Sequence, residues 1–174
     1  MKGLIHIYCG EGKGKTTAAL GLMMRASASG FQIIFAQFMK AWDTGELETL
    51  YKLDDVTVLR GDFPAKFSND YTMEERTAVI LENNRLFREA TTKVEPMAST
   101  LLVLDEIIGS MDKGLMDNSL VIDFLKKKDM NMEVVMTGRN PSDELIELAD
   151  YVSEIKKIKH PYEKGIKARK GIEY

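Results

Sequence analysis

One glycine-rich stretch near the amino terminus, residues 9–17, constrains the fold of this chain more than any other feature. It reads Cys-Gly-Glu-Gly-Lys-Gly-Lys-Thr-Thr, after a short apolar run at 4–8 and before a helix-like segment that continues from Ala18. A strand, a glycine-rich turn and a helix in this order are the setting of a phosphate-binding loop. The alternative, a glycine-rich turn that binds nothing, does not explain why Gly-Lys-Thr-Thr follows an apolar strand.

The residue types of this stretch suit the binding of phosphate groups. Glycines let backbone N–H groups turn inward, and the helix that begins here adds the positive end of its dipole. Lys15 is placed to reach the terminal phosphates, and the hydroxyl of Thr16 is placed to ligate Mg²⁺. The usual first glycine is replaced by Cys9, so the loop is a variant. We predict nucleotide contacts from Gly10, Glu11, Gly12, Lys13, Gly14, Lys15, Thr16 and Thr17.

Length, charge and cysteine content narrow the class of protein. A chain of 174 residues is expected to form a single domain, here residues 1–174. The net charge of −3 argues against a broad nucleic-acid surface. A single cysteine excludes an internal disulfide and suits the reducing cytoplasm. There is no apolar run of the roughly 18 residues that a membrane helix requires, and no signal peptide is recognised.

Apolar runs alternate with helical patterns along the chain. This alternation predicts an α/β fold in three layers, a mostly parallel sheet with helices on both faces. The sequence Thr-Met-Glu-Glu at 72–75 is a capping box that begins the longest helix. We predict strands near 4–8, 32–37, 56–59, 100–104, 133–137 and 151–158. We predict helices near 15–29, 45–53, 72–95, 118–128 and 141–150.

A second strong signal is the apolar run 101–104, which ends in Asp105 and Glu106. A run of this kind predicts a central buried strand. Ligands of such sheets bind beyond the carboxyl ends of the strands, so at least one of the two acids should face the phosphate loop. There it would hold Mg²⁺ or a water molecule bound to it, and we slightly favour Glu106. The alternative is a pair of acids that caps a helix.

Other residues at strand ends are individually ambiguous. Trp42 is expected to pack a helix onto the sheet, and Lys40 and Glu46 are expected to be surface charges. Arg139 follows a strand and a glycine, and it could bind phosphate bidentately or form a surface salt bridge. Cys9 borders a cationic loop that would lower its pKa, but without a neighbouring base it is weak evidence for nucleophilic catalysis.

Taken together, the motifs resemble those of the P-loop ATP:corrinoid adenosyltransferases, also called cob(I)alamin adenosyltransferases. The loop at 10–17 is similar to theirs and lacks the same glycine. Further matches follow in order and span nearly the whole chain. They are Gln37-Phe38-Met39-Lys40, Trp42 with Gly45-Glu46, Leu104-Asp105-Glu106, Thr137-Gly138-Arg139, Ala149-Asp150-Tyr151-Val152-Ser153-Glu154, Lys159-His160-Pro161 and the end of the chain, 165–173.

The resemblance implies a reaction in which the Co(I) of a reduced corrinoid attacks the 5′ carbon of ATP and triphosphate leaves. It also implies a RecA-like P-loop fold, Mg²⁺, a homodimer and a flavin protein that reduces the cobalt. By the same resemblance, the catalytic residues would be Lys15, Asp105 and Glu106, and Arg139 would join the ATP contacts. The Gly-Phe-Thr-Trp stretch of the family is replaced here by residues 61–67. The expected corrinoid contacts are Trp42, Glu46, Phe63 and Phe67.

Two other classes stay open on the residues alone. A small-molecule kinase of the nucleoside type shares a phosphate loop and an Asp-Glu strand end, but it would need a base near an acceptor hydroxyl. A nucleotide-dependent ATPase or partner protein would need a residue that positions water. The sequence offers no convincing base, which suits a reaction whose nucleophile is already reactive.

Overall fold

The computed structural model describes residues 2–66, 68–94 and 99–173, and it contains one six-stranded sheet. The strand order is β3-β2-β4-β5-β1-β6, and all neighbouring pairs are parallel. The strands are β1 (Ile5–Cys9), β2 (Gln32–Gln37), β3 (Val56–Arg60), β4 (Thr100–Asp105), β5 (Met132–Thr137) and β6 (Tyr151–Glu154).

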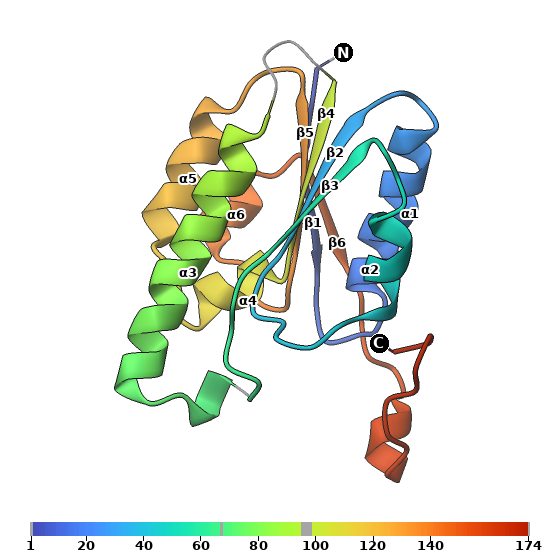
Figure 1. Cartoon of the computed structure of the whole chain (residues 1–174), viewed down its shortest axis with the longest axis vertical. Helices are drawn as coiled ribbons and strands as arrows, with labels where there is room; N and C mark the ends of the chain where they lie inside the picture. Colours follow the sequence, from blue (N-terminus) through green and yellow to red (C-terminus); the bar gives the residue numbers. More distant parts are fainter. Residues whose placement is uncertain (1, 67, 95–98, 174) are drawn as a thin grey trace.

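Helices cover both faces of this sheet, as Figure 1 shows. One face carries α1 (Lys15–Ser27) and α2 (Gly45–Leu50). The other carries α3 (Met73–Thr92), α4 (Ile107–Asp112), α5 (Asn118–Lys127) and α6 (Asp143–Leu148). Two separate apolar clusters fill the spaces between sheet and helices, one on each side. The predicted three-layer α/β fold is therefore confirmed.

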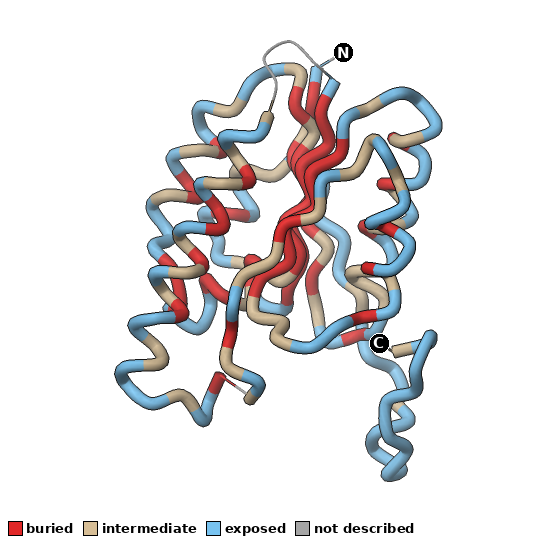
Figure 2. The backbone as a smooth tube through the Cα atoms, in the orientation of Figure 1, coloured by how far each residue is buried: buried red, intermediate tan, exposed pale blue. Residues whose placement is uncertain are grey.

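The strands of the sheet are buried to different degrees, depending on whether they lie at its centre or at its edge. All six residues of β4 are buried, because β2 and β5 flank it and helices cover both of its faces. In contrast, all four residues of β6 are exposed at the edge of the sheet. Figure 2 shows the buried residues concentrated along the middle strands. A continuous apolar sequence is typical of a parallel strand that is buried on both sides.

Most predicted element boundaries lie within three residues of the observed ones. The predicted strand 151–158 ends at Glu154, the predicted helix 45–53 ends at Leu50, and the predicted helix 141–150 spans only Asp143–Leu148. The helix α4 was not predicted, because its six residues are too few to show helical periodicity. The capping box of α3 is confirmed: Thr72 Oγ1 accepts from the Glu75 N–H at 3.2 Å, and the Glu75 carboxylate accepts from the Thr72 N–H at 2.7 Å.

The parallel arrangement brings several strand ends together. Because β1, β2, β4 and β5 run in one direction, their carboxyl ends lie at the same edge of the sheet. Gln37 pairs with Asp105 in register, and Tyr8 pairs with Thr137. None of the helices that the structure describes has the length and apolar character needed to cross a membrane.

Candidate active site

The glycine-rich loop joins β1 to α1 and is fixed by backbone hydrogen bonds to neighbouring strand ends. The Gly10 N–H donates to the Arg139 carbonyl at 3.1 Å, and the Gly12 N–H donates to the Ile155 carbonyl at 2.7 Å. A side chain at Gly12 would not fit, because its Cβ would lie 2.7 Å from that carbonyl oxygen. Gly14 caps α1 with a φ of 117°, a conformation that favours glycine.

Asp105 lies below this loop and is fully buried at the end of β4. Its Oδ1 accepts hydrogen bonds from Thr16 Oγ1 at 2.8 Å and from Thr137 Oγ1 at 2.7 Å. Its Oδ2 accepts from Lys40 Nζ at 2.9 Å and from Gln37 Nε2 at 3.3 Å. Four donors from four different elements or loops therefore converge on one carboxylate, which holds the loop threonine in a fixed position.

Lys40 is part of this cluster, so the expectation that it is a surface charge is wrong. Its side chain is 20% exposed and forms an ion pair with the fully buried carboxylate of Asp105. Burial acts to lower the pKa of Lys40, but the charge of Asp105 and its hydrogen bond outweigh burial, so the pKa is raised. The carboxylates of Glu106 and Glu46 act in the same direction. Lys40 is therefore held as an ammonium ion.

Glu106 has a different position from Asp105. It adopts the left-handed conformation, with a φ of 63°, and caps α4 without a side-chain hydrogen bond. Its N–H donates to Thr137 Oγ1 at 2.8 Å. Burial raises the pKa of Glu106, and the charge of Asp105 raises it further against the opposing effect of Lys40 and other cations. Asp105 is the acid that contacts Thr16, and the preference for Glu106 as the Mg²⁺ ligand stays a prediction.

A cavity of about 560 Å³ opens beside Thr16 and Thr17. Trp42 lines it and is 48% exposed, so the expectation that this residue packs a helix onto the sheet is wrong. The hydroxyl of Thr44, another lining residue, is buried and has no hydrogen-bond partner in the described part of the chain. The remaining lining residues are Leu20, Lys40, Gly45, Glu46, Gly171, Ile172 and Glu173.

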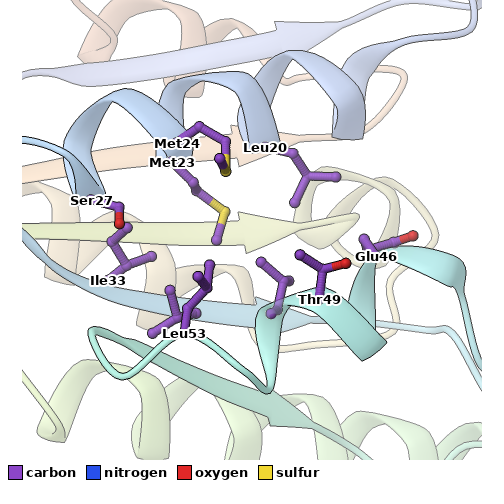
Figure 3. Close-up of a pocket in the computed structure, with 10 residues that line it drawn as sticks. Leu20, Met23, Met24, Ser27, Ile33, Glu46, Thr49 and Leu53 are labelled. Carbon is purple, nitrogen blue, oxygen red and sulfur yellow. The ribbon is translucent and has the colours of Figure 1, made fainter.

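A smaller apolar cavity of about 210 Å³ adjoins the first one between α1 and α2 (Figure 3). Leu20 and Glu46 line both cavities. In Figure 3, Met23 and Met24 of α1 face Leu53 and Thr49 across the opening. The larger cavity beside the loop therefore has a polar wall formed by Thr16 and Lys40. The smaller cavity next to it is lined mainly by apolar side chains.

The structure does not bring every predicted site residue into this cavity. Arg139 forms an exposed ion pair with Glu11, with 2.9 Å between Nη1 and Oε2, and lines a separate cavity of about 770 Å³. Phe63 is 6% exposed and belongs to the apolar cluster under α3. Phe67 lies outside the described residues. Burial raises the pKa of Cys9, and Glu154 adds to this effect against Lys15, so the expectation of a lowered pKa is wrong.

Some residues of the site were given no functional role in the sequence analysis. Gln37 and Thr137 are both fully buried strand-end residues that donate to Asp105. The only sequence feature that indicates a role for them is their position at the ends of apolar runs, within segments that match the family motifs. No sequence feature indicates that Thr44 belongs to the site.

The donor set at the loop fits a magnesium ion. The Thr16 hydroxyl and the Asp105 carboxylate are hard oxygen ligands, and they already lie 2.8 Å apart. Mg²⁺ is usually bound through one or two protein ligands together with substrate phosphates, and one hydroxyl with one carboxylate is such a set.

These features define a nucleotide-binding protein with a phosphate loop, and comparisons with known proteins identify its family. A family model described as "ATP:corrinoid adenosyltransferase BtuR/CobO/CobP" matches residues 1–174. The chain is 35% identical to a corrinoid adenosyltransferase of Sinorhizobium sp, covering 99% of this chain and 81% of that protein. It is 31% identical to the corrinoid adenosyltransferase of Escherichia coli K12, covering 99% and 86%. The chain belongs to the ATP:corrinoid adenosyltransferase family.

Solved structures support the fold independently. The cytoplasmic domain of EssC matches 96% of this chain with a TM-score of 0.56 and 14% sequence identity. ATPases 2 and 3 of EssC from Geobacillus thermodenitrificans match 97% of it with a TM-score of 0.55. This chain spans only about a third of each of those structures, 34% and 35%. At this identity the likeness concerns the fold alone.

Proposed function

We propose that this chain transfers the 5′-deoxyadenosyl group of ATP to the Co(I) of a reduced corrinoid and releases triphosphate. The observation that carries the proposal is the hydrogen bond from Thr16 of the loop to buried Asp105, beside a cavity that Trp42 lines, in a chain that matches the family throughout. Curated relatives that are 35%, 31% and 29% identical to this chain are named corrinoid adenosyltransferases. Family membership does not favour the kinase and ATPase alternatives.

The reaction exchanges one bond for another. The electron pair of Co(I) forms a cobalt–carbon bond at the 5′ carbon, the carbon–oxygen bond breaks, and triphosphate leaves with the bonding electrons. No proton has to be removed from the nucleophile, so no general base is required. The residues of this chain have two tasks: to orient the 5′ carbon, and to stabilise the negative charge of the leaving triphosphate.

The loop residues are suited to the second task. Lys15 Nζ donates to the Gly12 carbonyl at 2.9 Å, so it is held within the loop. We infer that Lys15, the loop N–H groups and the amino-terminal end of α1 bind the phosphates. Thr16 and Asp105 would hold Mg²⁺, with Glu106 close by. When bound, this ion neutralises part of the phosphate charge.

The positions of the expected corrinoid contacts indicate from which side a corrinoid would approach. Trp42 and Glu46 line the cavity beside the loop, so we infer that a corrinoid approaches from this side. Phe63 is buried, so a corrinoid contact there would require the segment after β3 to move. The role of Phe67 stays a prediction.

We also propose a setting for the reaction. Co(I) requires a strong reductant, so a flavin protein that reduces the cobalt is the expected partner. A reducing cytoplasm suits both this chemistry and the free thiol of Cys9. A homodimer is proposed from the family resemblance, and sedimentation of the purified protein would test it.

The direct test is anaerobic. The protein is mixed with chemically reduced cobalamin and ATP–Mg²⁺, and the cobalt absorbance is followed. We expect the Co(I) spectrum to convert to that of an alkyl-cobalt species only when ATP is present. A matched control omits ATP and supplies adenosine with tripolyphosphate. A Co(I) spectrum that stays unchanged while ATP is consumed would contradict the proposal.

A further inference from the structure

Lys40 stands out among the residues of the cavity because its ammonium group lies on the same cavity wall as the loop threonines. It lines the 560 Å³ cavity together with Thr16 and Thr17. Thr16 and Lys40 bind opposite oxygens of the same carboxylate, Oδ1 and Oδ2 of Asp105. A phosphate group that reached the Thr16 hydroxyl would therefore also come close to the ammonium group of Lys40.

The ammonium group has unused hydrogen-bonding capacity. A lysine ammonium carries three N–H donors. Among the described residues, the one hydrogen bond of Lys40 Nζ is to Asp105 Oδ2. Lys40 can therefore keep its bond to Asp105 and donate to a ligand at the same time. Gln37 Nε2 also donates to Oδ2, at 3.3 Å, so this oxygen keeps a second donor if Lys40 shifts.

The backbone that presents Lys40 is strained. Met39 has a φ of 58°, in the left-handed region that residues other than glycine rarely occupy. This turn lies between the end of β2 and Lys40, and just before it the Phe38 N–H donates to the Asp105 carbonyl at 2.9 Å. Strain of this kind persists where the surrounding structure requires a particular placement, and it is concentrated at functional sites.

We propose that Lys40 is a second phosphate-binding cation of this site, bridging Asp105 and the triphosphate of bound ATP opposite Lys15. The two lysines approach the phosphates from different elements, Lys15 from the loop at the start of α1 and Lys40 from the turn after β2. Lys40 offsets the charge of the buried acid, and it also meets the phosphate charge of the ligand. This inference rests on the proposed function only in that a triphosphate occupies the cavity.

Trp42 gives a direct readout, because it is the only tryptophan of the chain and lines the same cavity. Its fluorescence is titrated with tripolyphosphate–Mg²⁺ and, separately, with adenosine, always without corrinoid. The variant is Lys40→Met, which removes the charge and keeps the length of the side chain. The matched control is Lys126→Met, because Lys126 also forms an ion pair of 2.9 Å, with Glu144, away from the cavity.

We expect Lys40→Met to weaken tripolyphosphate binding by about tenfold or more, as for the loss of a charged hydrogen bond. Adenosine binding should stay within about twofold, Lys126→Met should match the parent, and Lys40→Arg should recover most of the tripolyphosphate affinity. Unchanged tripolyphosphate affinity in Lys40→Met would overturn the proposal. An equal loss of adenosine affinity would also overturn it, because Lys40 would then act only on the fold.

Folding of the variant is checked by circular dichroism before the titrations. If Lys40→Met does not fold, Lys40→Gln decides the matter, because its amide still donates to Asp105 without a charge. Weak tripolyphosphate binding by a folded Lys40→Gln supports the proposal, and parent-like binding contradicts it. Since corrinoid is absent throughout, this result is independent of whether the chain adenosylates corrinoids.

Discussion

At the scale of single residues, the site depends on the hydrogen bonds that one buried carboxylate accepts. Asp105 is fully buried, and it accepts from two hydroxyls, one ammonium and one amide. A buried carboxylate is stable only when its oxygens are paired and hydrogen-bonded. The same set of contacts fixes Thr16 below the phosphate loop, so stability and substrate binding share these residues.

Replacing Lys15 should separate activity from folding. Its ammonium donates to the Gly12 carbonyl, and no ion pair of Lys15 is found among the described residues. We expect Lys15→Ala to lower turnover at least about a hundredfold, because the leaving triphosphate loses a cation. The melting temperature should stay within a few degrees of the parent. Near-normal turnover in a folded variant would remove the phosphate-loop assignment.

Asp105→Asn should raise the Mg²⁺ requirement and destabilise the protein. The change removes a metal-ligand charge and leaves the Lys40 ammonium without its partner, which should cost about 3 kcal/mol in the free energy of unfolding. Denaturant unfolding and a Mg²⁺ titration of turnover measure the two effects. Glu106→Gln is the matched variant, with an increased Mg²⁺ requirement but no loss of the Lys40 ion pair. Metal titrations of both variants that overlay the parent would make the two acids purely structural.

At the scale of elements, α3 shows how a local sequence signal fixes a helix end. The capping box predicted at 72–75 is present, and Lys66 adds an ion pair to Glu75 at 2.7 Å. The hydrogen bond from Lys66 lowers the pKa of the Glu75 carboxyl, and the Thr72 N–H contributes in the same direction. The folded state therefore favours the ionised carboxylate.

This pKa shift gives a signed prediction for stability against pH. A carboxyl group whose pKa is lowered by folding stabilises the protein above its unfolded pKa, about 4.3 for Glu. The stabilisation is lost as the pH falls through the lower pKa of the folded state. Glu75→Gln keeps the capping hydrogen bond but has no charge. Thermal melts should show the parent more stable at pH 7, with the difference shrinking as the pH falls below about 4.3. A constant difference across this range would contradict the assignment.

At the scale of the whole molecule, some parts of the site can be predicted from the sequence and others cannot, for a physical reason. The phosphate loop and the Asp105-Glu106 strand end are contiguous in sequence, and local chemistry is enough to recognise them. The contacts of Asp105 with Lys40 and Thr137 span 65 and 32 residues. They depend on β4 lying between β2 and β5, and neither apolar periodicity nor spacing specifies this order.

The fold is easier to predict from the sequence than the site, because its strands and helices alternate in a simple pattern. Each apolar run became a strand of the parallel sheet, and each predicted helix is present. The exposure of Trp42 cannot be predicted from this alternation. An isolated tryptophan is usually buried, and here the turn after β2 places it on a cavity wall.

The central claim concerns which bond of ATP breaks, and ³¹P NMR of the phosphate products tests it most directly. The folded protein is incubated anaerobically with ATP–Mg²⁺ and reduced cobalamin, and the same mixture without cobalamin serves as the control. We predict one equivalent of intact triphosphate for each adenosylated corrinoid, and no phosphate release in the control. ADP and inorganic phosphate formed at the same rate with and without cobalamin would contradict the claim and favour a kinase or an ATPase.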